Sequence, residues 1–105
     1  MHARIALTTR CINNLLVEIE FDPAKNARNI RERGLSFTQV VEFDFATAVF
    51  SVDVRRDYGE IRDRALRFLD NCLHALVFVE TAAGIRVISF RKANAREVRR
   101  YETQT

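Results

Sequence analysis

Cysteine, proline and glycine are scarce in this chain. Its 105 residues include two cysteines, one proline and three glycines, and tryptophan is absent. Cys11 and Cys72 lie far apart, with no further Cys or His at the spacing of metal ligands. Neither a disulfide framework nor a zinc site is therefore predicted, and we expect no cofactor. This use of cysteine fits a reducing compartment, so we expect a cytoplasmic protein.

Long apolar runs are also lacking. Residues 1–16 contain no acidic side chain, as in transit peptides, but polar residues interrupt the apolar ones too often for a signal peptide or a membrane span. We expect residues 1–16 to be a disordered or loosely attached tail, residues 17–105 to form the domain, and no membrane to be a partner. A chain of this size has one modest core, which argues against a large buried catalytic cavity.

Arginine, in contrast, is abundant. The formal net charge is +3, and 15 of the 17 basic residues are Arg. The guanidinium has a planar fork of donors that matches phosphate, so this preference favours a nucleic-acid partner. Ion pairs on the surface explain the same composition, and composition alone does not decide between the two.

The start of the expected domain predicts a short strand and two short helices. Residues 17–21 alternate apolar and acidic side chains, as in a strand. The Asp-Pro pair at 22–23 is typical of a helix start, and Gly34 is typical of a helix end. Ser36 and Gln39 then form the pattern of a capping box, which predicts a second helix. Two helices joined by a tight corner do not by themselves indicate a function.

The period of the apolar residues then changes from that of a helix to two. Strands are predicted over residues 48–54, 62–68, 73–81 and 85–91. The third of these is almost continuously apolar and is therefore expected at the centre of the sheet. Asn94 and Glu97 form a second capping box and predict a C-terminal helix. The fold class is thus α+β: an antiparallel meander with two N-terminal helices and one C-terminal helix.

Three segments in this order resemble the BrnT family of bacterial toxins. They read FDPAKNARNIRERGLSF, YGEIRDRAL and IRVISFRKANAREVRRYE, and the resemblance extends from about Val17 to Glu102. It implies a RelE-like fold and a metal-independent endoribonuclease, the toxin of a type II toxin–antitoxin system, which cleaves RNA to inhibit translation and growth. It also implies a hetero-oligomer with a ribbon-helix-helix antitoxin of the BrnA type. Operator DNA would be bound only through that antitoxin.

The chemistry of RNA cleavage gives roles to residues in these segments. Attack by the 2′-hydroxyl on its own phosphate requires charge stabilisation on the phosphate oxygens and two proton transfers. We expect Lys25, Arg62 and Arg86 to clamp the phosphate. Glu60 is the fourth catalytic candidate, either as a base or as the residue that orients Arg62. The expected RNA-binding residues are Arg33, Arg91, Lys92 and Tyr101.

Several of these residues have a second interpretation. Strand alternation places Arg86 and Arg91 on opposite faces unless the strand ends or bulges. Arg91 and Lys92 either bind phosphate or are solvated cations beside a helix. Tyr101 either stacks on a base or closes the core. His74 heads an apolar strand, and we expect it to be packed there rather than to act as a base.

Three places depart from the family pattern, and one of them is Arg67, where relatives have glycine after the Ala-Leu pair. Where many relatives have His before the helix-ending glycine, this chain has Arg33, which cannot accept a proton but still binds phosphate. RNA binding is therefore a firmer expectation than rapid turnover. The alternative function is a catalytically weak module of the same fold that binds RNA or the antitoxin. At the hairpin before residue 73, Asn71 stands where relatives have glycine, and Asn also tolerates the left-handed conformation.

Overall fold

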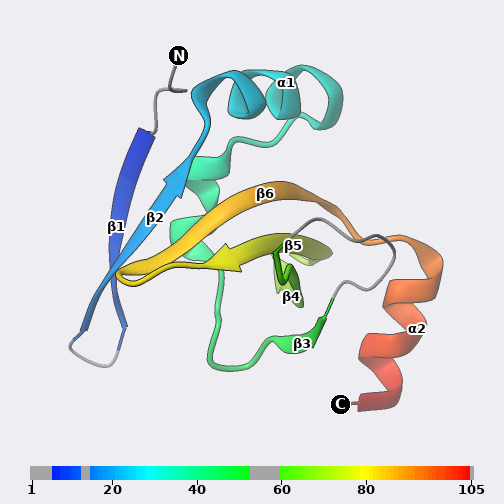
Figure 1. Ribbon diagram of the computed structural model, residues 1–105. Coiled ribbons are helices and arrows are strands. Elements are labelled where there is room, and N and C mark those ends of the chain that lie inside the picture. The colour runs from blue at the N-terminus through cyan, green and yellow to red at the C-terminus, as the bar shows by residue number, and fades with distance from the viewer. Residues whose placement is uncertain (1–5, 13–14, 53–59, 105) are drawn as a thin grey trace.

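The computed structural model describes residues 6–12, 15–52 and 60–104. They form one six-stranded sheet with the strand order β1-β2-β6-β5-β4-β3, flanked by helices (Figure 1). The elements in chain order are β1 (Ala6–Ile12), β2 (Leu15–Phe21), α1 (Pro23–Arg33), the 3₁₀ helix η1 (Phe37–Glu42), β3 (Val49–Val52), β4 (Asp63–Leu69), β5 (Cys72–Glu80), β6 (Gly84–Lys92) and α2 (Ala95–Gln104). No described helix is long and apolar enough to cross a membrane.

The predicted meander is confirmed for β3 to β6. Each of these strands pairs antiparallel with the next, and β5 lies between β4 and β6 with most of its residues buried, as its apolar run indicates. Leu69 pairs with Cys72, so the connection of β4 and β5 is a two-residue turn. Asp70 and Asn71 have positive φ angles of 51° and 68° there. Asn71 therefore adopts the left-handed conformation expected of it.

The sheet is nevertheless mixed rather than wholly antiparallel. β2 runs parallel to β6 over three register pairs, from Glu18↔Gly84 to Glu20↔Arg86. A Cβ atom on Gly84 would lie 2.0 Å from the carbonyl oxygen of Glu18, so only glycine allows the two backbones to approach this closely. This pairing joins segments far apart in sequence, and local patterns did not indicate it.

The prediction of a loose N-terminal tail is wrong for residues 6–12. They form β1, which pairs antiparallel with β2 from Ala6↔Phe21 to Ile12↔Leu15. The physical reason is that β2 presents a second edge of backbone N–H and C=O groups, and β1 satisfies them. The boundary at residue 17 therefore falls within a hairpin of the sheet.

The helix ends follow the predicted chemistry, but the second helix is of another type. The Asp22 carboxylate accepts a hydrogen bond of 2.9 Å from the Ala24 N–H, and Gly34 ends α1 with φ 71°. The capping box begun by Ser36 is present. The element it starts is a 3₁₀ helix, and its buried residues Phe37 and Val40 lie three positions apart, the repeat of a 3₁₀ turn.

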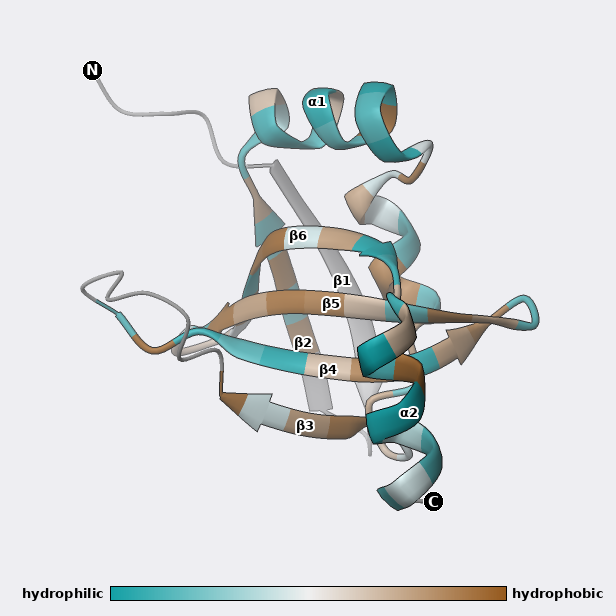
Figure 2. Ribbon diagram, turned by 90° about the vertical axis from the view of Figure 1, so that its right-hand side faces the viewer, coloured by the Kyte–Doolittle hydropathy of each residue, from teal (hydrophilic) through white to brown (hydrophobic). Residues whose placement is uncertain are grey.

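Two apolar clusters are buried around the sheet. The larger includes Ile19, Leu76, Phe90 and side chains of η1, and the smaller packs α2 onto the strands through Tyr101. Figure 2 shows the contrast between the largely hydrophobic β5 and the largely hydrophilic α1. The core is therefore built from the strands, η1 and α2, and α1 contributes little to it.

Candidate functional site

The helix α1 covers an edge of β6 that β2 leaves open. The pairing of β2 with β6 stops at Arg86, and α1 lies above the continuation of β6 (Figure 1). Asn29 is buried on the side of α1 that faces this edge. Its Nδ2 donates to the carbonyl oxygens of Phe90, at 2.8 Å, and Leu35, at 2.9 Å. One amide thus replaces a missing strand partner and fixes α1 over β6.

The polarity of α1 is unusual for a surface helix. Such helices normally turn an apolar stripe inwards, but the one buried residue of α1 is Asn29, and Ile30 is 46% exposed. A polar stripe with the spacing of one helix face borders the space above β6. It consists of Lys25, Arg28, Asn29, Glu32 and Arg33. The charged side chains of this stripe remain exposed, so they are accessible to a polar ligand.

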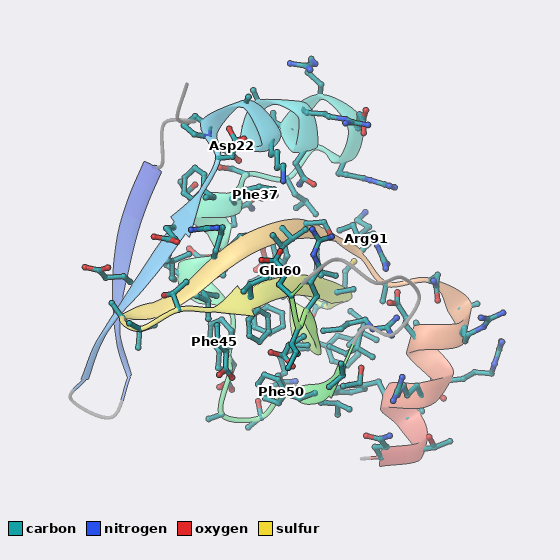
Figure 3. The ribbon with its side chains drawn as sticks, in the orientation of Figure 1. Asp22, Phe37, Phe45, Phe50, Glu60 and Arg91 are labelled. Atoms are coloured by element: carbon teal, nitrogen blue, oxygen red, sulfur yellow. The ribbon has the colours of Figure 1, made fainter. Side chains whose placement is uncertain are left out.

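This stripe forms one wall of a hollow of about 280 Å³, which we call the cationic hollow. Its other walls are Phe37, Arg62, Ile88, Ser89 and Arg91. Figure 3 shows Phe37 beneath α1, and Arg91 where β6 approaches α2. The lining has five cationic side chains and one carboxylate, so the hollow carries an excess of positive charge, with hydrogen-bond donors on both sides.

Some of these cations are already paired. Arg28 bonds Glu32 one turn away, at 3.0 Å, and Arg62 lies 3.5 Å from Glu60. Lys25 and Arg33 have no ion-pair partner in the part of the chain that the structure describes. Since like charges held together are unfavourable without a counter-charge, these two cations favour an external anion.

A β-bulge in β6 shapes the floor of the hollow. Val77 pairs with Ser89 but Phe78 pairs with Val87, so Ile88 is an extra residue on β6. The bulge shifts the alternation of β6. Arg86 then pairs with Val79 and Arg91 with Ala75, which lie on one face of β5, so the two arginines come to the same face of the sheet. The conflict that strand alternation predicted for these two arginines is resolved in this way.

Glu97 in the first turn of α2 holds Arg91. Only 4% of the Glu97 side chain is exposed, and its two oxygens accept hydrogen bonds of 2.6 and 3.1 Å from Nη1 and Nη2 of Arg91. Arg64 adds a contact of 3.5 Å, and the Asn94 N–H donates to the same carboxylate at 3.0 Å. Burial acts to raise the pKa of Glu97, but the hydrogen bonds from Arg91 and Asn94 outweigh it and lower the pKa.

The structure brings together half of the residues singled out from sequence. Lys25, Arg33, Arg62 and Arg91 all line the cationic hollow. Arg86 does not line it, and instead bonds Glu20 on β2 at 2.9 Å. Of the three residues expected to clamp the phosphate, Lys25 and Arg62 thus line the hollow and Arg86 does not.

The other candidates lie outside the lining. Glu60 is beside Arg62, an arrangement that fits orientation of the guanidinium. Lys92 is exposed. Tyr101 is 9% exposed and packs edge to face on Phe68, so it closes the core as its alternative interpretation proposed. His74 is buried and stacks on the ring of a core phenylalanine, as expected of a packed histidine.

Sequence reasoning missed Arg28, Asn29, Ser89 and Glu97. The first two were readable, because the polar residues of α1 recur at the spacing of one helix face. The roles of Ser89 and Glu97 depend on the bulge and on the docking of α2, which no local pattern indicates. Among the described residues, no three His, Cys, Asp or Glu side chains are placed to hold a metal ion.

Comparisons with known proteins give the family and the fold of the chain. A family model described as "Ribonuclease toxin, BrnT, of type II toxin-antitoxin system" matches residues 21–97, a range that contains the whole lining of the hollow. Among solved structures, the chain is similar to the ribonuclease toxin BrnT of Brucella abortus, with 24% sequence identity and a TM-score of 0.56. The match covers 83% of this chain and 99% of that one, and at this identity it shows the fold. No curated protein matches the chain.

Proposed function

Because the chain belongs to the BrnT family of ribonuclease toxins of type II toxin–antitoxin systems, we propose that it is an endoribonuclease that binds the RNA backbone in the cationic hollow. The observation that carries this proposal is the convergence of five cations from α1, β6 and the residues before β4 on one small hollow. Two of them, Lys25 and Arg33, have no ion-pair partner in the described chain. RNA backbone phosphate is the anion that the activity of the family supplies.

The proposed reaction is attack by a ribose 2′-hydroxyl on the adjacent phosphorus. The bond from phosphorus to the 5′-oxygen breaks, which leaves a 2′,3′-cyclic phosphate and a 5′-hydroxyl. Negative charge grows on the non-bridging oxygens, and Lys25, Arg33 and Arg62 would stabilise it, together with the hydroxyl of Ser89. Glu60, 3.5 Å from Arg62, would hold that guanidinium in place.

We propose that this cleavage needs no metal ion. The lining contains a single carboxylate, Glu32, and Arg28 already binds it at 3.0 Å. Divalent cations such as Mg²⁺ prefer several oxygen ligands and would be repelled by the five cations. The chemistry of the lining thus favours guanidinium and ammonium groups as the source of positive charge.

One observation favours the second candidate function, a module that binds RNA or an antitoxin with weak catalysis. No histidine is among the residues that line the hollow in the described chain, and Glu32 is engaged by Arg28. Both proton transfers then lack the side chain best suited to them near neutral pH. If no other group transfers these protons, the protein binds RNA but cleaves it slowly.

The family also implies an antitoxin partner. We propose that it is a ribbon-helix-helix protein of the BrnA type, that the two form a hetero-oligomer in the bacterial cytoplasm, and that operator DNA is bound through the antitoxin. A RelE-like fold belongs to the same proposal. Val98 and Tyr101 of α2 pack on the chain's own core, so the better surface for a partner is apolar residues of the outer strands. Phe50 and Val52 of β3 are each 50% exposed.

A comparison of two oligonucleotides tests the ribonuclease proposal. The purified protein is incubated in EDTA with an RNA strand and with the same sequence carrying 2′-O-methyl groups, which cannot attack the phosphate. We expect the RNA to be cut with cyclic phosphate ends, and the methylated strand to be bound but intact. Binding of both strands with no cleavage would support the weakly catalytic module instead. Failure to bind either strand would contradict the ribonuclease and leave only a module that binds an antitoxin.

A further inference from the structure

The guanidinium of Arg91 is held at one end by a buried carboxylate. Nη1 and Nη2 each donate to a different oxygen of Glu97, at 2.6 and 3.1 Å, and Nη1 also lies 3.4 Å from the carbonyl oxygen of Lys92. The carboxylate is in turn fixed by the Asn94 N–H and by Arg64. Four groups therefore determine where this one guanidinium sits, and the side chain of Arg91 is only 18% exposed.

The remaining donors of Arg91 form a complete fork. A guanidinium has five N–H bonds, and the contacts above use three of them. The two left over are Nε–H and the second hydrogen of Nη2, which lie along the same edge of the planar group. Two parallel N–H donors on one edge are the geometry that binds two oxygens of a phosphate. Since Arg91 also lines the cationic hollow, this edge is the one available to an anion there.

We propose that Glu97 is a positioning residue for RNA binding: it holds the end of the Arg91 guanidinium so that the side fork meets a backbone phosphate in the cationic hollow. This inference rests on the proposed function. The carboxylate is not among the residues that line the hollow, so it acts on a bound phosphate through Arg91. A flexible arginine would have to lose side-chain freedom on binding, whereas one that Glu97 already holds loses little.

The arrangement also links the hollow to the start of α2. Glu97 accepts from the Asn94 N–H while its own N–H bonds the Asn94 side chain at 2.9 Å, so the residue that holds Arg91 also caps the helix. A stability effect of any Glu97 substitution is therefore expected. The test must separate that effect from a loss of binding that runs through Arg91.

A double-mutant cycle makes this separation. The dissociation constant of the 2′-O-methyl RNA strand is measured for the parent, Glu97→Gln, Arg91→Ala and the double variant, at fixed salt and on protein shown to be folded by circular dichroism. Glu97→Asp, which keeps the charge on a shorter side chain, is the second variant. Glu102→Gln is the control, because Glu102 is exposed on the same helix and no ion pair of the described chain includes it.

We expect Arg91→Ala to weaken binding about tenfold, the value of one charge-assisted contact. In the parent, Glu97→Gln should cause much of this tenfold loss of affinity. In the Arg91→Ala background, the same substitution should weaken binding by less than about twofold, because the guanidinium that Glu97 holds is then absent. Glu97→Asp should bind more tightly than Glu97→Gln, and Glu102→Gln should match the parent. Equal losses from Glu97→Gln in both backgrounds, or no loss in either, would overturn the inference and leave the proposed function standing. A parent that does not bind the strand would overturn both.

Discussion

Asn29 and Phe90, 61 positions apart, are joined by a buried hydrogen bond of 2.8 Å from the side-chain amide to the backbone carbonyl. The bond attaches α1 to the part of β6 that pairs with β5 on one edge and that β2 leaves unpaired on the other. The same turn of α1 presents Arg28 and Glu32 to the cationic hollow. The position of the hollow therefore depends in part on this polar side chain.

Substitution of Asn29 by Ala should destabilise the protein and weaken the site together. Two carbonyl oxygens, of Leu35 and Phe90, lose their donor, which should lower the free energy of unfolding by about 2 kcal/mol. Urea denaturation measures this change. Arg31→Ala is the control, because Arg31 is exposed on the same helix and lies outside the hollow, and it should shift the free energy by less than about 0.5 kcal/mol. Equal effects of both variants would show that Asn29 does not hold α1 in place.

Local chemistry determined how much of this fold could be predicted from sequence. The start of α1 at Asp22 and its end at Gly34 depend on neighbouring residues, and so does the capping box begun by Ser36. The four-strand meander was predictable because consecutive strands pair. β1 was missed, although Asn13 and Asn14 before β2 are residues typical of a two-residue hairpin turn.

The site was less predictable, because it is assembled from distant segments. Lys25 and Arg62 were placed together on family resemblance, and the structure brings them into one hollow. Arg86 was expected beside them, but the parallel pairing of β2 with β6 sets it opposite Glu20, which binds it. The bulge at Ile88 and the pairing of β2 with β6 depend on contacts across the sheet, and periodicity within one strand carries no information on them.

Gly84 and Gly34 should respond differently to substitution by Ala. At Gly84 the new Cβ would lie 2.0 Å from the carbonyl oxygen of Glu18, so β2 and β6 must separate, which should cost about 3 kcal/mol or more. At Gly34 the new Cβ would have no atom of a non-neighbouring residue within 4 Å. The loss of stability there is that of placing alanine in the left-handed conformation, about 1 kcal/mol. Thermal and urea unfolding of the two variants would compare them. A smaller loss at Gly84 than at Gly34 would contradict the close parallel pairing.

The stabilisation that Glu97 provides should disappear in acid. The pKa of Glu97 is lowered from its ordinary value of 4.5, because the bonds from Arg91 and Asn94 outweigh its burial. A depressed folded-state pKa means that the contribution is fully present above pH 4.5 and is lost as the pH falls through the folded-state pKa. Glu97→Gln should therefore be less stable than the parent by about 2 kcal/mol at pH 7, and the difference should shrink towards pH 3. A difference that is constant across this range in urea denaturation would refute the linkage.

The partner surface is tested by two matched apolar positions. Val52 of β3 and Ile30 of α1 are exposed to a similar extent, 50% and 46%. If the antitoxin covers the outer strands, Val52→Asp should weaken the complex by about 2 kcal/mol, or roughly thirtyfold, as at an interface hot spot. Ile30→Asp should leave it unchanged. Each variant is titrated with purified antitoxin, and size-exclusion chromatography measures how much complex forms. A larger loss of affinity for Ile30→Asp than for Val52→Asp would place the interface at α1.

The most direct measurement of the central claim, that the cationic hollow stabilises the phosphate during RNA cleavage, is the single-turnover cleavage rate of Arg62→Ala. Removal of a cation that acts mainly in the transition state should slow the reaction about a hundredfold, equivalent to about 3 kcal/mol. Arg100→Ala, on the exposed side of α2 and outside the hollow, should cleave within about twofold of the parent. If Arg62→Ala cuts RNA as fast as the parent at matched concentration of folded protein, the hollow is not the catalytic site.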